Sequence, residues 1–399
     1  MNGVNLPNKK KRTSPVKIVL VVAALLISAA LIQQVILGML SAEARQELHM
    51  AATGVSVSYG FDMHQGFHSP NTRHFFFSTR EGVQIKTSAG DLLQEYSFNL
   101  RHPVMIGRGS TVAIGEPDGH KIYVFNTEGL WYYVNFEHPT ILYNVNQAGH
   151  LSVITRTNVG YELQVFNPNN PQSYVFRNPI NDANVFPTAI DVSECGTYIA
   201  LALLDVDTLI YSQITFNYIR RADSRALGLT DGLIRGYIYN NEFIYRIQFT
   251  NCGRVLVFTD QQILGFATGP ETQGALWSIP LYNQPDILYI GENNFAYVTG
   301  DPFLNHPEAK EPGVLHIYNF YGQLTGTYDL GGRATHLSIG FNTILVGTGR
   351  TFYAITAHGL QLWQYSALQD VANMIFMDNT DTVLMAGGAS AVVMQLVSK

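Results

Sequence analysis

The chain has 399 residues, of which 46% are hydrophobic and 14% are charged, and its formal net charge is −6. This composition excludes a disordered chain, which would hold more charge and fewer apolar residues, and two cysteines are too few to frame a disulfide-rich miniprotein. Residues 1–40 hold five basic and no acidic residues, which leaves the remainder with 19 basic and 30 acidic residues, a net charge of −11. We expect no nucleic-acid partner, because binding to a phosphate backbone depends largely on Lys and Arg.

The first predicted element is a transmembrane helix over residues 18–40, preceded by a basic tail, residues 1–17. Its 23 uncharged residues would span roughly 34 Å as a helix, enough to cross a hydrocarbon core of about 30 Å. Basic residues cluster on its N-terminal side, so the tail is predicted to stay in the cytoplasm and the body to lie outside it. The lipid bilayer is therefore an expected partner, and the predicted location is the cell membrane with a single crossing.

A cleaved signal peptide is the alternative to an uncleaved anchor. Ala42-Glu43-Ala44 has the small-x-small form of a cleavage site. The apolar stretch is longer than the usual signal-peptide core, which favours the anchor. Residues 41–53 would then form a helix-compatible spacer between the membrane and the body.

Residues 54–399 are predicted to form one extracytoplasmic all-β domain. Short runs rich in Val, Ile, Tyr, Phe and Thr alternate with Gly, Asn, Asp and Pro clusters, at a period typical of four-stranded propeller blades. Each unit combines an apolar inner hairpin with an outer hairpin built around a glycine turn. Seven inner hairpins and a partial unit near residues 72–98 favour an eight-bladed β-propeller over a seven-bladed one.

Three further features concern how the units join. The last unit, Val371–Lys399, supplies only three strands, so the free strand at residues 54–61 is expected to complete it and close the ring. The outer strands carry all three tryptophans, which are expected to pack between blades: Trp131, Trp277 and Trp363. Residues 220–241 and 301–313 interrupt the period and are interpreted as insertions in the fourth and sixth blades.

Short motifs suggest a family. SECGTYIALALL (193–204) resembles the hairpin of WD-like repeats, and ITAHGLQLWQYS (355–366) resembles the final turn of quinoprotein-type repeats. The whole arrangement, and DVSECGTYIALALLDVDTLIYSQITFNYI (191–219) in particular, resembles an uncharacterised family of membrane-anchored extracytoplasmic propellers of clostridial-type Gram-positive bacteria. The resemblance implies a fold and a topology and implies no activity, because propellers host both enzymes and scaffolds.

Candidate chemical groups are few, and the sequence predicts no catalytic, cofactor-binding or metal-ligating residue. His64, His68 and His74 are close in sequence, but they are better explained as a solvated linker than as a metal site. Asp and Asn at 205–207 and 378–381 fit hairpin turns better than calcium loops.

Two other motifs also have structural explanations. Cys195 and Cys252 occupy equivalent turns of consecutive blades, where two free thiols are favoured over a disulfide. GRGSTVAIG (107–115) superficially resembles a phosphate loop, but it leads into a strand and is interpreted as a hairpin turn.

The favoured function is a noncatalytic, membrane-tethered binding or assembly scaffold, whose ligand is an envelope protein, peptide or glycan. The alternative is an extracytoplasmic propeller enzyme, either a carbohydrate hydrolase or a quinone-dependent oxidoreductase, with its site at the central channel. Facing carboxylates in a polar channel would favour the enzyme, whereas an apolar plug would argue against it. A third hypothesis is a sensor that signals through the single helix to a cytoplasmic partner.

Overall fold

The computed structural model describes residues 48–58, 66–69, 74–207, 210–220, 232–251, 253–268, 274–282, 285–299, 313–340, 343–377, 382–387 and 390–398. Residues 49–397 form one compact unit. The expected basic tail 1–17 and membrane segment 18–40 lie outside the described residues. Within those residues, no helix is long and apolar enough to span a membrane.

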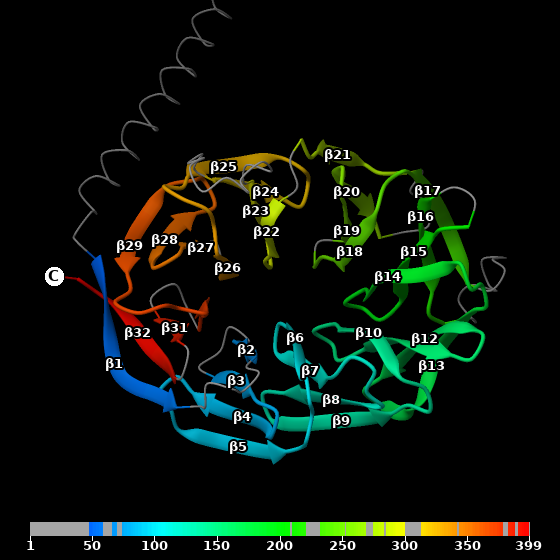
Figure 1. The fold of residues 1–399 in the computed structure, drawn as a ribbon, viewed down its shortest axis with the longest axis horizontal. Helices are drawn as coiled ribbons and strands as arrows, with labels where there is room; N and C mark the ends of the chain where they lie inside the picture. The colour runs from blue at the N-terminus through cyan, green and yellow to red at the C-terminus, as the bar shows by residue number, and fades with distance from the viewer. Residues whose placement is uncertain are drawn as a thin grey trace, which may run out of the picture. The chain divides into compact units, whose positions relative to one another are not determined.

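The described strands form eight four-stranded antiparallel sheets arranged as the blades of a propeller (Figure 1). This confirms the expected all-β fold and eight blades in place of seven. We number blades 1 to 7 from β2 onward, and within each the strands run from the innermost to the outermost in chain order.

The strands of blades 1 to 4 are β2 (Gly66–His68), β3 (His74–Ser78), β4 (Gly82–Thr87), β5 (Leu92–Ser97); β6 (Val104–Arg108), β7 (Thr111–Gly115), β8 (Lys121–Asn126), β9 (Gly129–Asn135); β10 (Thr140–Val145), β11 (Leu151–Thr157), β12 (Gly160–Asn167), β13 (Asn170–Ile180); and β14 (Val185–Val192), β15 (Tyr198–Asp205), β16 (Tyr211–Tyr218), β17 (Leu233–Asn240). Those of blades 5 to 7 are β18 (Ile244–Phe249), β19 (Arg254–Thr259), β20 (Gln262–Ala267), β21 (Trp277–Pro280); β22 (Pro285–Ile290), β23 (Asn294–Thr299), β24 (Val314–Asn319), β25 (Leu324–Asp329); and β26 (His336–Gly340), β27 (Thr343–Thr348), β28 (Thr351–Thr356), β29 (Gln361–Ser366).

Blade 8 joins the two ends of the domain. It contains β30 (Asn373–Phe376), β31 (Thr382–Ala386) and β32 (Ser390–Ser398), and its outermost strand is β1 (Leu48–Ser58). The Thr53 hydroxyl donates to the Val393 carbonyl at 3.0 Å across this junction. The predicted closure is therefore confirmed, but the strand begins at Leu48 and not at residue 54, so the last residues of the expected spacer 41–53 belong to the sheet.

The hydrophobic core lies between blades. Each cluster of buried apolar side chains among the described residues joins two neighbouring sheets. One of them packs Phe76 and Ile85 of blade 1 against Val112 and Phe125 of blade 2, all without solvent exposure. Successive side chains of a strand point to opposite faces, so each strand provides apolar residues to both faces of its sheet. Because both faces are buried, each blade depends on the blades on either side of it for stability.

The tryptophans lie in outer strands as expected, and two of them face the following blade. The indole of Trp131 on β9 occupies the space beside Gly149 of blade 3, and that of Trp277 on β21 stacks on Phe295 of blade 6 at a centroid distance of 6.3 Å. A Cβ on Gly149 would meet the Trp131 ring at 2.4 Å, so glycine is required there by close approach.

Two sequence interpretations need correction. Gly66–His68 was expected to lie in a solvated linker, but it forms β2, the innermost strand of blade 1. Residues 220–241 were interpreted as an insertion, but Leu233–Asn240 within them is β17, the regular outermost strand of blade 4. The remainder of that stretch at 221–231 and most of the Pro-rich segment at 301–313 lie outside the described residues; the latter joins β23 to β24, as expected.

Candidate functional site

The candidate site is a central cavity of about 740 Å³, bounded by the innermost strand of every blade. Its volume lies in the range typical of small-molecule sites. The wall combines apolar residues with charged and amide-bearing ones, which include Arg108, Asn144, Glu194, Arg246, Gln248 and Glu292. The cavity is therefore a polar site and not the apolar plug that would have argued against channel chemistry.

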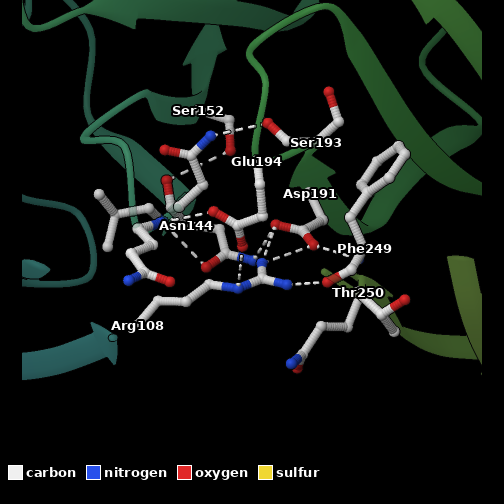
Figure 2. A network of polar contacts seen from close by, with 12 residues as sticks. Arg108, Asn144, Ser152, Asp191, Ser193, Glu194, Phe249 and Thr250 are labelled. Carbon is white, nitrogen blue, oxygen red and sulfur yellow. Dashed lines mark hydrogen bonds and ion pairs between the residues drawn. The ribbon is translucent and has the colours of Figure 1, made fainter. Parts of the chain in front are cut away.

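Arg108 connects three blades at this wall. It ends β6 of blade 2, yet its guanidinium pairs with two carboxylates of blade 4 (Figure 2). Nη1 lies 2.7 Å from Asp191 Oδ2, Nε lies 2.9 Å from Glu194 Oε1, and Nη2 donates to the Phe249 carbonyl of blade 5. The following turn contains Gly109 at a φ of +53°, a conformation that glycine adopts without strain and that lets the chain reverse there. The expected hairpin in GRGSTVAIG is thus confirmed.

Asp191 is the buried centre of this cluster. Its side chain is 1% exposed and lies near the end of β14. Besides the Arg108 guanidinium, it accepts hydrogen bonds from the Phe249 backbone N–H at 2.6 Å and from Asn144 Nδ2 at 3.0 Å. A buried carboxylate is tolerated only when paired and hydrogen-bonded, and here one carboxylate ties together blades 2, 3, 4 and 5.

Glu194 holds the opposite side of the Arg108 guanidinium. It lies in the turn between β14 and β15, and its Oε2 accepts a hydrogen bond from the Gln147 backbone N–H of blade 3 at 2.9 Å. Gly196 completes this turn at a φ of +66°. The turn residues of SECG therefore bring a carboxylate to the wall of the cavity, in addition to reversing the chain.

The three charged groups of the cluster shift one another's pKa values. Burial raises the pKa of Asp191 and of Glu194, and the Arg108 charge opposes the rise in both. Burial by itself would lower the pKa of Arg108, but the two carboxylates outweigh it and raise that pKa, so the guanidinium stays charged.

A second arginine, Arg246 on β18, differs from Arg108 in its surroundings. Its Nη2 donates to Gln248 Oε1 at 3.1 Å, and the described residues include no carboxylate in an ion pair with it. Burial lowers the pKa of Arg246, repulsion from Arg108 lowers it further, and Tyr289 on β22 partly opposes both effects. Arg108 is thus paired with two carboxylates, whereas Arg246 has none in an ion pair with it among the described residues.

Two histidines connect neighbouring blades beside the cavity. His68 Nε2 lies 2.8 Å from the Gly109 carbonyl oxygen, and His336 Nε2 donates to the Met374 carbonyl. Burial lowers the pKa of His68 and lowers that of His336 to about 4, so both are neutral at pH 7. A neutral ring that donates from Nε2 suits a structural link between strands.

The other sequence candidates are distributed through the fold. His74 lies on β3, whereas His64 lies outside the described residues. Within the described part, no three potential metal-ligating side chains gather. Asp205 accepts from the Tyr211 hydroxyl at 2.7 Å and from the Asp207 backbone N–H at 3.0 Å, as a turn residue does; the 378–381 stretch is outside the described residues.

Cys195 carries a free thiol that is exposed, 3.4 Å from the Ser193 hydroxyl. Burial opposes ionisation of this thiol, but hydrogen bonds with Ser193 and Thr197 outweigh it and lower its pKa. Cys252, its partner in the alternative of a disulfide, lies outside the described residues.

The Arg108, Asp191 and Glu194 cluster was not found from the sequence. Arg108 and Asp191 are 83 positions apart and sit in stretches that read as ordinary hairpins. The available signal is Asp191 itself, a carboxylate within the apolar strand TAIDV, since a buried acid requires a cation nearby.

Eight four-stranded blades around a polar cavity define the chain as an eight-bladed β-propeller. The C-terminal WD40 domain of Sif2 is similar, with a TM-score of 0.57 and 8% identity over 86% of this chain and 98% of that one. BamB from Moraxella catarrhalis matches with a TM-score of 0.49 and 12% identity over 87% of this chain and 99% of that one. At 8% identity the likeness to the Sif2 domain shows a shared fold and does not extend to function.

Within this class, the chain belongs to a family of unknown function, DUF5711, whose family model matches residues 72–396. No curated protein matches the sequence. The family assignment covers nearly the whole propeller and assigns it no activity.

Proposed function

We propose that this protein is a noncatalytic binding or assembly module, tethered by residues 18–40 to the outer side of the cytoplasmic membrane, whose partner binds at the central cavity. The observation that carries the proposal is the polar cavity of about 740 Å³, to which every blade contributes. An envelope protein, peptide or glycan that inserts a side chain or a terminus would reach this wall.

The ion pairs of Asp191 and Glu194 with Arg108 favour a binding function over glycoside hydrolysis. A carbohydrate hydrolase needs an acid and a base, or a nucleophile, on either side of the scissile bond. Asp191 and Glu194 instead engage the same guanidinium, and Asp191 is sealed from solvent, so Glu292 is the carboxylate of the described wall that lies outside this cluster. This arrangement fits a wall held rigid for recognition better than the alternative of a channel enzyme.

The binding proposal is tested by blocking the cavity mouth. Asn251 lines the cavity at the exposed turn after β18, and Asn251→Trp would place a large ring there. Asn169→Trp, at the exposed turn between β12 and β13, is a matched control away from the cavity. Proximity labelling from the full-length protein in its host is expected to recover an envelope partner with wild type and N169W and to lose it at least tenfold with N251W.

Two outcomes would overturn the proposal: no reproducible partner with the wild-type protein, or equal recovery with N251W and wild type. The tether is tested separately. Full-length protein should stay with membranes after alkaline extraction, and protease added to spheroplasts should digest the propeller while sparing the basic tail. Release into the soluble fraction, with a new N-terminus near Ala44, would instead identify a cleaved signal peptide.

A further inference from the structure

Arg246 is a cation on the cavity wall that lacks a carboxylate of its own. Arg108 nearby has two carboxylates, whereas Arg246 has only the amide oxygen of Gln248 at 3.1 Å. A guanidinium offers five N–H donors in a planar fork, so most of its hydrogen-bonding capacity is not taken up by side chains of the described residues. Unpaired charge in a partly desolvated site is unfavourable, and a ligand of opposite charge relieves it.

No charged group among the described residues forms an ion pair with Arg246. Arg108 repels it, and Asp191 attracts it but is already bound by Arg108 and two further donors. The remaining influences come from Tyr289 on the adjacent innermost strand and Tyr245 next in sequence. Both tyrosines line the same cavity, and no hydrogen bond occupies the Tyr289 hydroxyl within the described part of the chain.

We propose that the central cavity binds a small organic anion, whose carboxylate or phosphate group pairs with Arg246 and accepts a hydrogen bond from the Tyr289 hydroxyl. Guanidinium groups recognise both anions through two parallel N–H···O bonds. Apolar wall residues such as Ile247, Ile339 and Phe376 would contact the organic part. The inference rests on the proposed binding function and names the chemistry of the ligand.

The test uses full-length protein purified in detergent, at constant ionic strength maintained with sodium chloride. Inorganic phosphate and succinate are titrated separately by isothermal calorimetry, which distinguishes a phosphate site from a carboxylate site. At least one probe is expected to bind saturably. Arg246→Gln should weaken that binding at least tenfold, and Arg246→Lys should lose less, because it keeps the charge without the fork.

A matched control is Arg156→Gln, which removes an exposed arginine located 3.7 Å from Asp118 and should leave the affinity unchanged. Folding of each variant is checked by its melting temperature. If R246Q does not fold, R246K and Tyr289→Phe carry the test, and unchanged affinity in both overturns the inference. Failure of both probes to bind the wild-type protein at tens of millimolar also overturns it.

The two proposals fail in different ways. Loss of partner recovery in N251W together with absent anion binding would leave the binding scaffold standing and remove the anion site. Weaker binding in R156Q equal to that in R246Q would show a nonspecific charge effect and would likewise remove the site.

Discussion

Removing the Arg108 side-chain charge should destabilise the propeller far more than removing a surface arginine. In Arg108→Met, Asp191 stays buried with a 1% exposed side chain and loses the cation that forms its ion pair among the described residues, while the Phe249 carbonyl and the Glu194 carboxylate lose their shared donor. Breaking one side of a buried ion pair costs about 3–5 kcal/mol. Because the cluster joins blades 2 to 5, the loss acts on the whole closed ring and not on one hairpin.

The magnitude converts into a measurable shift. For the 49–397 unit, an unfolding entropy of about 2.1 cal/mol/K per residue gives roughly 0.7 kcal/mol/K, so 3–5 kcal/mol lowers Tm by about 4–7 °C.

The Tm shift caused by Arg108→Met should also depend on pH. Burial raises the pKa of Asp191, and Arg108 no longer opposes it in the variant, so Asp191 is protonated more readily in the folded state. The destabilisation is therefore largest above that raised pKa and shrinks as pH falls below it.

The assay is differential scanning fluorimetry of the full-length protein at pH 7.5 and pH 5. Arg350→Met is the control, because Arg350 pairs with Asp370 at 2.7 Å but the two side chains are 58% and 89% exposed. A surface pair of this kind contributes at most about 1 kcal/mol. If R108M behaves like R350M, or if its Tm loss is larger at pH 5 than at pH 7.5, the cluster does not stabilise the ring as described above.

Three further predictions concern packing, acid stability and closure. Gly107→Ala should cost about 1–3 kcal/mol in chemical denaturation, because its Cβ would lie 2.2 Å from the His68 ring, and His68→Ala should relieve much of that cost; additive losses would contradict the clash. Burial lowers the pKa of His336 to about 4, so its contribution to stability is present above the unfolded pKa near 6.5 and is lost as pH falls toward 4. His336→Gln should make the melting temperature depend less on pH between 6.5 and 4, and an unchanged pH dependence would show that His336 does not cause this loss of stability. Deleting residues 1–58 should lower Tm and promote aggregation relative to deleting 1–47, because only the first exposes the edge of β32; equal behaviour on thermal scans and size-exclusion chromatography would rule against closure by β1.

The blades were predictable because each carries its own local signal. Two apolar runs around a glycine or asparagine turn define a hairpin without reference to the rest of the chain, and the three-strand last unit implied a partner for β32. Strand β2 was missed for a physical reason: it has only three residues, His68 among them, and its burial comes from neighbouring blades instead of from an alternating pattern of its own.

The site was harder to predict than the fold. Arg108, Asp191 and Glu194 meet only because blades 2 and 4 face one cavity, and no local pattern encodes that meeting. Arg246 is even harder to predict from the sequence, because what distinguishes it is the lack of an ion-pairing carboxylate among the described residues. The sequence shows which residues are charged, but the arrangement of the blades in the ring determines which of them form ion pairs.

Strand β1 also imposes an order on biosynthesis. The ribosome makes Leu48–Ser58 before every other described strand and its partner β32 after them, so the sheet that seals the ring cannot form until the intervening blades have been synthesised. Until then β1 has no strand to pair with. The unfinished propeller presents unpaired strand edges, which favour aggregation or chaperone binding. The entropic cost of closing a loop grows only slowly with its length, although forming such a distant pairing is slow. The completed ring therefore joins the first and last described strands of the propeller into one cooperative unit.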